Sequence, residues 1–172
     1  DPNADPCGYR TLLTLQLAEI YYHQPNLAKL VAQKDNRFIR PKEVDLLALL
    51  ETGAIDYIFL YRSVAVQHGL KYLILPNEIN LGSPNHSSFY QIASVTIRGS
   101  SPSDSITIIG EPMVYGITIP TNAPNLPLAK RFIRYFLDKE KGLKIIENMG
   151  MPILNPILAN GEIDEDLKYI VE

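Results

Sequence analysis

Apolar residues recur at helical spacing just after the start of the chain. The stripe consists of Leu12, Leu13, Leu15, Leu17, Ala18 and Ile20. Asp5 is a favoured N-cap residue, and Pro6 suits the first helical position because its missing N–H has no helical partner there. The pattern predicts a helix that begins after Asp5, runs to about Tyr22, and is followed by a second, shorter helix at about 26–33.

A similar helix start recurs at residues 40–43. Pro41 suits the first helical position and Glu43 the first turn, where a negative charge complements the helix dipole. Gly53 is placed to end this helix. Residues 54–61 are almost continuously apolar, which is typical of a strand covered on both faces. A helix, a glycine and a buried strand in this order indicate an α/β fold.

The middle of the chain alternates short helical and extended patterns. A short helix is expected at 63–68, strands at 70–75, 92–98, 105–109 and 113–119, and a surface loop at 76–88. The turn at 99–104 makes the second and third of these strands an antiparallel pair. After a linker at 121–127, apolar spacing predicts a helix that breaks near Asp138 and ends at Gly150, before an irregular tail with one last turn after Asp164.

Composition and charge limit the classes of protein to which the chain can belong. The chain has 172 residues, of which 46% are hydrophobic and 20% charged, and a net charge of −3, as in an ordinary globular domain. It lacks a cluster of Lys and Arg, so we expect no nucleic-acid partner. A single cysteine, Cys7, excludes a disulfide framework within the sequence. The first residues include neither an initiator methionine nor a signal-like segment, so we expect a piece of a longer protein.

The sequence contains few features typical of an enzyme active site. Its three histidines, His23, His68 and His86, lie in separate segments, and it has no nucleophile elbow, P-loop or dinucleotide-binding glycine motif. Cys7 lies beside a helix start, which can lower a thiol pKa, but a nucleophile also needs a positioned histidine. We therefore expect neither a catalytic residue nor a cofactor.

Two interpretations of the carboxylates at the helix starts stay open. Asp5 and Glu43 can simply stabilise their own helices, by about 0.3–2 kcal/mol each. Alternatively, the two helix starts converge on one small anion, with free N–H groups as donors.

Several motifs resemble those of archaeal tungstate/molybdate-binding proteins, the solute-binding subunits of oxyanion ABC importers. They are residues 5–10 (Asp-Pro-Cys-Gly-Tyr-Arg), 40–47 (Arg-Pro-Lys-Glu-Val-Asp-Leu-Leu), 53–68, 75–82 and 114–120. These motifs follow the family's order and extend over most of the chain, to about Pro152.

The resemblance implies a type II periplasmic-binding-protein fold, with a mixed sheet flanked by helices and the oxyanion held between two lobes. In that fold, residues 1–125 form the second lobe and residues 126–172 form C-terminal helices that return toward a first lobe, which is mostly absent here. The segment between Gln33 and Arg40 is shorter than the hairpin usual in the family.

The resemblance also implies a site. Asp5 and Glu43 match the liganding carboxylates, Tyr61 matches a tyrosine that faces the oxyanion, and Cys7 lies close by through its backbone. Two carboxylates repel a dianion, but they can bind the Mo or W atom itself and raise its coordination from tetrahedral to distorted octahedral, since high-valent metals suit carboxylate oxygen. Sulfate cannot expand its coordination in this way, so the pair also selects against it.

The expected function is therefore capture of tungstate or molybdate outside the cell, by a surface-anchored protein that delivers the anion to the membrane permease of an ABC transporter. Two alternatives use the same fold. One is an oxyanion-sensing regulatory domain, and the other, ranked lower, is an enzyme.

Overall fold

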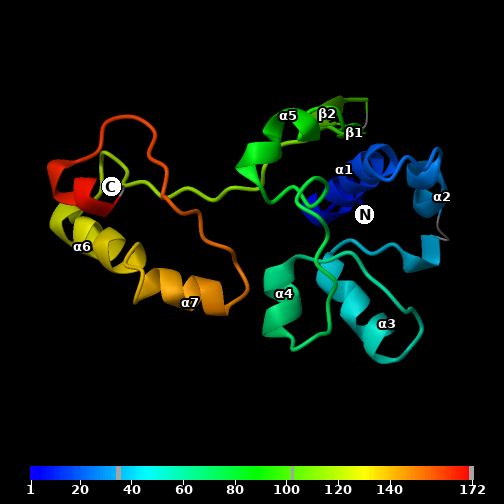
Figure 1. Ribbon diagram of the computed structural model, residues 1–172, viewed down its shortest axis with the longest axis horizontal. Helices are drawn as coiled ribbons and strands as arrows, with labels where there is room; N and C mark the ends of the chain where they lie inside the picture. The colour runs from blue at the N-terminus through cyan, green and yellow to red at the C-terminus, as the bar shows by residue number, and fades with distance from the viewer. Residues whose placement is uncertain (34–35, 102, 171–172) are drawn as a thin grey trace. The chain divides into compact units, whose positions relative to one another are not determined.

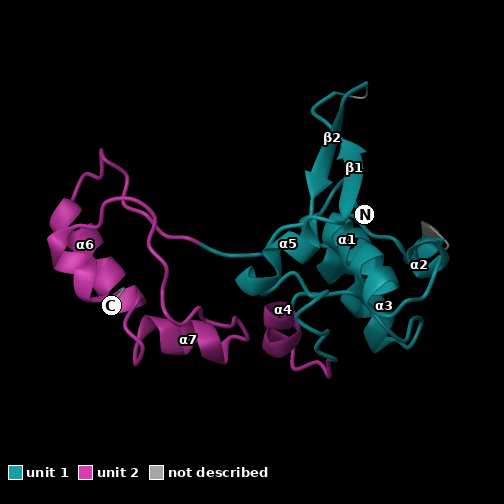
Figure 2. Cartoon of the chain, turned by 45° about the horizontal axis from the view of Figure 1, so that its top comes forward, with its two compact units in different colours: residues 1–61, 73–115 teal, residues 62–72, 116–172 magenta. Residues whose placement is uncertain are grey.

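A computed structural model describes residues 1–33, 36–101 and 103–170 (Figure 1). The chain divides into two compact units (Figure 2). Unit 1 contains Asp1–Tyr61 and Leu73–Tyr115, and unit 2 contains Arg62–Tyr72 and Gly116–Glu172. The predicted division into lobes at residue 125 concerns a longer protein and stays a prediction.

The helices of unit 1 follow the sequence pattern closely. Helix α1 (Pro6–Tyr21) has Asp5 as its N-cap, and α2 (Leu27–Ala32) follows it. The 3-10 turn η1 (Asn36–Phe38) precedes a second one, η2 (Glu43–Leu46), which continues into α3 (Leu47–Glu51). The helix predicted to begin at Pro41 thus begins two residues later. Gly53 ends it with a φ of +69°, a conformation that a glycine adopts without strain.

An antiparallel hairpin packs beside α1. Strands β1 (Ser94–Arg98) and β2 (Ser105–Ile109) pair as predicted, with Thr96 opposite Thr107. The Gln16 side chain on α1 donates to the Ser94 carbonyl at 2.8 Å and accepts from the Ser94 N–H at 3.0 Å. These two bonds fix the hairpin to the helix that carries Asp5.

The core of unit 1 lies under a segment predicted as a surface loop. It consists of Leu13, Leu17, Ala18, Ile79, Leu81, Tyr90 and Ala93. Residues 76–88 include the 3-10 turn η3 (Pro84–His86) and the start of α5 (Ser87–Tyr90). The loop interpretation is wrong for Ile79 and Leu81, which are buried. The Tyr90 hydroxyl organises this segment by bonding to the Asn77 carbonyl and accepting from the Ser83 N–H at 3.2 Å.

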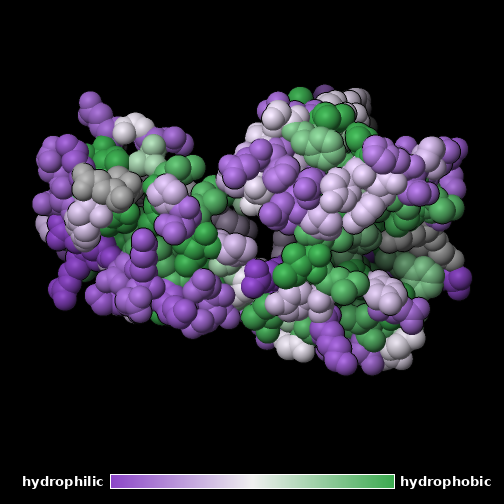
Figure 3. All heavy atoms as spheres, in the orientation of Figure 1, coloured by the Kyte–Doolittle hydropathy of each residue, from purple (hydrophilic) through white to green (hydrophobic). Residues whose placement is uncertain are grey.

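Three predicted strands do not form. Residues 54–61, 70–75 and 113–119 contain no strand, and the described residues hold the β1–β2 sheet alone instead of a mixed sheet. A strand needs a neighbour to pair its backbone N–H and C=O groups, and no described segment offers one here. Tyr57, Leu73 and Tyr115 are consequently 83–85% exposed. Figure 3 shows apolar side chains on the visible surface of both units.

Unit 2 is helical in its described part. It contains α4 (Arg62–Gln67), α6 (Leu126–Phe136), α7 (Gly142–Asn148) and the 3-10 turn η4 (Glu165–Ile170). The predicted break near Asp138 is confirmed, since α6 and α7 are separate helices. Lys130 on α6 pairs with Asp164, and Arg134 with Asp166 at 3.3 Å, so the tail is held against α6. Among the described residues, no helix is both long and apolar enough to cross a membrane.

Candidate functional site

The start of α1 fixes the first of the two carboxylates. Asp5 has extended backbone, and its Oδ1 accepts a hydrogen bond from the N–H of Cys7 at 2.7 Å. Gly8 lets the chain pass closely here, because a Cβ at this position would lie 2.5 Å from the carbonyl carbon of Asp1. The side chain of Asp5 therefore caps the helix, as predicted, and its orientation is fixed by the backbone.

The second carboxylate comes from a segment 38 residues further along the chain. Glu43 is the first residue of η2, and its N–H donates to Oδ2 of Asp5 at 3.2 Å. The two oxygens of Asp5 thus accept hydrogen bonds from the two helix starts, Oδ1 from the N–H of Cys7 and Oδ2 from the N–H of Glu43. The two helix starts therefore lie together in unit 1, and the interpretation that they converge on an anion stays a prediction.

The pKa values of the two carboxyl groups are shifted in opposite directions. A hydrogen bond with Asp5, followed by burial, raises the pKa of Glu43. Burial also raises the pKa of Asp5, but the bonds from Glu43 and from the backbone of Cys7 and Glu43 outweigh it, so the net shift of Asp5 is downward. Glu43 therefore holds its proton more tightly than an isolated glutamic acid, and Asp5 ionises first.

Counter-charges are scarce around this pair. Within the described ranges, neither carboxylate forms an ion pair with a Lys or Arg side chain. The same part of the chain holds no group of three or more His, Cys, Asp or Glu that could bind a metal ion.

Cys7 contacts the carboxylate pair through its backbone N–H, which donates to Asp5. Its thiol is buried and lies 3.7 Å from the carbonyl oxygen of Phe59. Burial, reinforced by the charges of Glu43 and Asp5, raises the pKa of the thiol to about 12. The lowered thiol pKa considered from the sequence is therefore wrong, and Cys7 stays a protonated, poorly nucleophilic group.

Tyr61 ends the first segment of unit 1 (Asp1–Tyr61), next to a residue that sequence reasoning missed. Nη1 of Arg10 donates to its hydroxyl oxygen at 2.6 Å. Burial raises the pKa of Tyr61, although the bond from Arg10 opposes the shift, so the hydroxyl keeps its proton at neutral pH. The two residues are 51 positions apart, and only the motif 5–10, in which Arg10 is the last residue, pointed to this part of α1.

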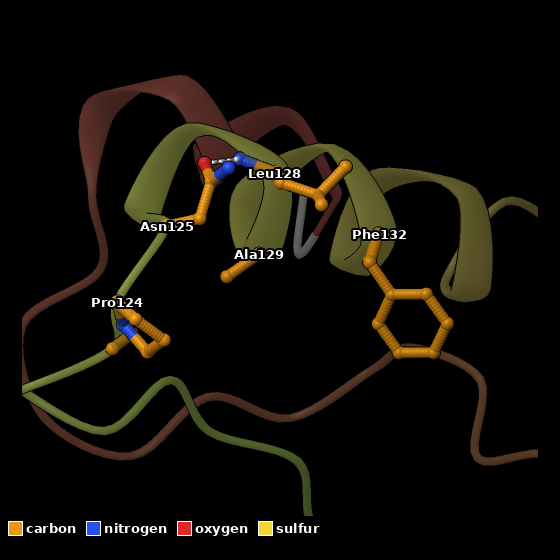
Figure 4. Close-up of a pocket in the computed structure, with 6 residues that line it drawn as sticks. Pro124, Asn125, Leu128, Ala129 and Phe132 are labelled. Carbon is orange, nitrogen blue, oxygen red and sulfur yellow. Dashed lines mark hydrogen bonds between the residues drawn. The ribbon is translucent and has the colours of Figure 1, made fainter.

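The surface grooves are less suitable candidates for a site that binds an anion. In unit 2, an open groove of about 490 Å³ is lined by Pro124, Leu128, Ala129 and Phe132, with Asn125 at its edge (Figure 4). The side chain of Asn125 caps α6 by accepting from the Leu128 N–H at 3.1 Å, which leaves mostly carbon facing the groove. Such a surface provides few polar groups for a charged solute, so the Asp5–Glu43 pair is the candidate site.

Comparison with known proteins defines the class. Residues 1–152 match the family described as bacterial extracellular solute-binding protein. The chain belongs to this family.

Two kinds of relative are informative. A molybdate/tungstate-binding protein WtpA of Pyrococcus abyssi is 42% identical over 192 residues, covering 100% of this chain and 54% of the relative. Its counterpart in Thermococcus kodakarensis is 40% identical, over 100% and 53%. An uncharacterized solute-binding protein of Petrotoga mobilis is 50% identical over 159 residues, or 91% of this chain and 49% of the relative. The resemblance seen in the motifs is confirmed.

The chain spans about half the length of these curated relatives. The alignment with the Pyrococcus protein is 192 residues long, against 172 residues here, so the relative carries additional residues inside the aligned region. The short segment predicted between Gln33 and Arg40 includes residues 34–35, which lie outside the described residues.

Proposed function

We propose that this chain is part of a solute-binding protein that captures tungstate or molybdate outside the cell and delivers it to an ABC transporter. The observation that carries the proposal is the convergence of Asp5 and Glu43 without a Lys or Arg partner among the described residues. Two relatives that carry molybdate and tungstate in their names cover the whole chain at 40–42% identity.

The chemistry of the carboxylates explains which anion suits them. Two unit charges about 4 Å apart repel by roughly 4 kcal/mol at an effective dielectric constant of about 20. The pair therefore disfavours an anion that offers only oxygen atoms, such as sulfate. Molybdate and tungstate also offer a hard, high-valent metal atom that accepts carboxylate oxygen. Direct bonds from Asp5 and Glu43 to that atom offset the electrostatic repulsion. Because sulfate forms no such bonds, they also make the site selective for molybdate and tungstate over sulfate.

The backbone of the site holds the ligands in place. The N–H groups of Cys7 and Glu43 both donate to Asp5, so they fix the carboxylate that faces the metal atom. Cys7 thus belongs to the site through its N–H, and Tyr61 supplies a hydroxyl donor to an oxygen of the anion. No cofactor is part of this proposal.

The same family supports a proposal for the architecture of the whole protein. We place this chain mainly in the second lobe of a type II binding protein, with its C-terminal helices returning toward the first lobe. The intact protein is anchored at the cell surface, and its partner is the membrane permease of the transporter. Capture and delivery return the anion to its original form, so the function is not enzymatic.

Isothermal titration of the intact protein tests the function. We expect tungstate and molybdate to bind with submicromolar dissociation constants, stronger than about −8.2 kcal/mol. Sulfate is expected to bind at least about a hundredfold more weakly, a difference of about 2.7 kcal/mol. Equal affinity for all three anions, or no heat with any of them, would contradict the proposal.

A further inference from the structure

Arg10 occupies an unusual environment in unit 1. Its guanidinium carbon lies 5.6 Å from the centre of the Tyr9 ring and 5.8 Å from that of Tyr61, and Nη1 donates to the Tyr61 hydroxyl at 2.6 Å. Within the described residues it forms no ion pair with a carboxylate. Its contacts are thus with two aromatic rings and one hydroxyl rather than with an acidic side chain.

The direction of the bond from Arg10 decides what Tyr61 can do. A guanidinium only donates, so the phenolic oxygen accepts this bond with a lone pair. The hydroxyl hydrogen must then point to a different acceptor. Among the described residues, no acceptor receives a bond from the Tyr61 hydroxyl. The bond from Arg10 fixes the oxygen of this half-buried hydroxyl, and its hydrogen has no acceptor among the described residues. The hydroxyl can therefore donate a hydrogen bond to a ligand that enters the site.

We infer that Arg10 is a positioning residue, which makes Tyr61 a dedicated hydrogen-bond donor to the bound oxyanion. This inference rests on the proposed function and adds a residue to its site. Cation–π contacts with the rings of Tyr9 and Tyr61 limit rotation of the guanidinium, so the phenolic oxygen is held in place before the anion arrives. The ordering of the side chains then costs less at the moment of binding.

A purely structural role is the competing explanation. In that case Arg10 only joins α1 to the segment that ends at Tyr61, by packing of its guanidinium against the rings of Tyr9 and Tyr61. Loss of Arg10 then weakens binding to the same extent with or without the hydroxyl of Tyr61. In the positioning role, loss of Arg10 matters only while that hydroxyl is present, which a double-mutant cycle detects.

The experiment titrates the intact protein with tungstate in four forms: unmodified, Arg10→Met, Tyr61→Phe and the double variant. We expect each single substitution to weaken binding about tenfold, or about 1.4 kcal/mol. The double variant should bind about as well as Tyr61→Phe alone. Arg98→Met is the control for net charge, since Arg98 is exposed at the end of β1; it should change affinity less than about twofold.

The outcomes separate this inference from the function on which it rests. If the unmodified protein binds neither tungstate nor molybdate, the proposed function fails and the role of Arg10 fails with it. If it binds and the two losses multiply in the double variant, or Arg10→Met binds normally, only the positioning role is overturned. Should Arg10→Met fail to fold, Arg10→Gln, which keeps a donor without the charge, takes its place in the cycle, and the same non-additivity is expected.

Discussion

The carboxylate of Asp5 accepts a hydrogen bond from the backbone N–H of Glu43 at 3.2 Å, although 38 residues separate them in the chain. This contact brings together two acidic side chains from two helix starts. Because the carboxyl of Glu43 is held beside that of Asp5, its pKa is raised. The pair is therefore less favourable for stability than two isolated caps, which is expected where a site is selected for binding a ligand.

Substitutions at Asp5 separate helix capping from anion binding. Asn caps a helix about as well as Asp but lacks the charge. In the intact protein, Asp5→Asn keeps the bond from the Cys7 N–H but loses the second oxygen, which accepts from the Glu43 N–H. It should therefore lower the unfolding free energy by about 0.5–1 kcal/mol, while tungstate affinity falls at least about tenfold. Asp5→Ala loses both bonds and should lose affinity and about 1–2 kcal/mol of stability. Titration calorimetry and denaturant unfolding measure the two effects. Full affinity in Asp5→Asn would show that capping alone explains this residue.

Removing the charge of Glu43 should stabilise the unliganded protein at neutral pH. The folded-state pKa of Glu43 is raised, so the stability this group contributes is present below its unfolded pKa and is lost as the pH rises through its folded pKa. Glu43→Gln removes that loss, and because the group is partly solvated the gain should be about 1 kcal/mol or less. Denaturant unfolding at neutral and acidic pH measures it, with Glu51→Gln on α3 as the control. A Glu43→Gln protein less stable than the unmodified one at neutral pH contradicts the prediction.

The same raised pKa predicts how binding depends on pH. Coordination of the metal atom requires Glu43 in its ionised form. Tungstate affinity should therefore fall as the pH drops through the raised pKa of Glu43, and this happens at a higher pH than for an ordinary glutamic acid. The measurement is a series of titrations from neutral to mildly acidic pH, alongside the Glu43→Gln variant. If that variant keeps the full pH dependence, Glu43 is not its source.

Cys7 should be unreactive and replaceable. Its thiol is buried and its pKa is raised to about 12, so almost no thiolate is present at neutral pH. We expect a thiol reagent to label the native protein far more slowly than the unfolded protein. Cys7→Ala should change tungstate affinity less than about twofold, since it keeps the N–H that binds Asp5 and the effect falls well below 1.4 kcal/mol. Rapid labelling, or a large loss of affinity, would assign a role to the sulfur.

The sequence predicted the local parts of this structure well. The cap at Asp5, the end at Gly53 of the helix predicted from Pro41, and the hairpin at 94–109 depend on neighbouring residues, and all three are confirmed. The motifs that resemble oxyanion-binding proteins also pointed to Asp5 and Glu43, which the fold brings into contact.

The incorrect predictions concern long-range partners. Residues 54–61 have the composition of a buried strand, but a strand forms only where a neighbour pairs with its backbone, which no described segment does. Ile79 and Leu81 are buried inside a turn-rich stretch because Tyr90 anchors that stretch through Asn77. The bond between Arg10 and Tyr61 joins positions 51 residues apart, and neither residue type specifies the other as its partner.

X-ray absorption at a tungsten edge, on the intact protein with tungstate bound, tests direct coordination most plainly. If Asp5 and Glu43 bind the metal atom, the spectrum should show a distorted octahedral tungsten with two added oxygen neighbours, and the Asp5→Asn and Glu43→Gln variants should lose that signature. A tetrahedral tungsten spectrum, indistinguishable from that of free tungstate, would contradict it.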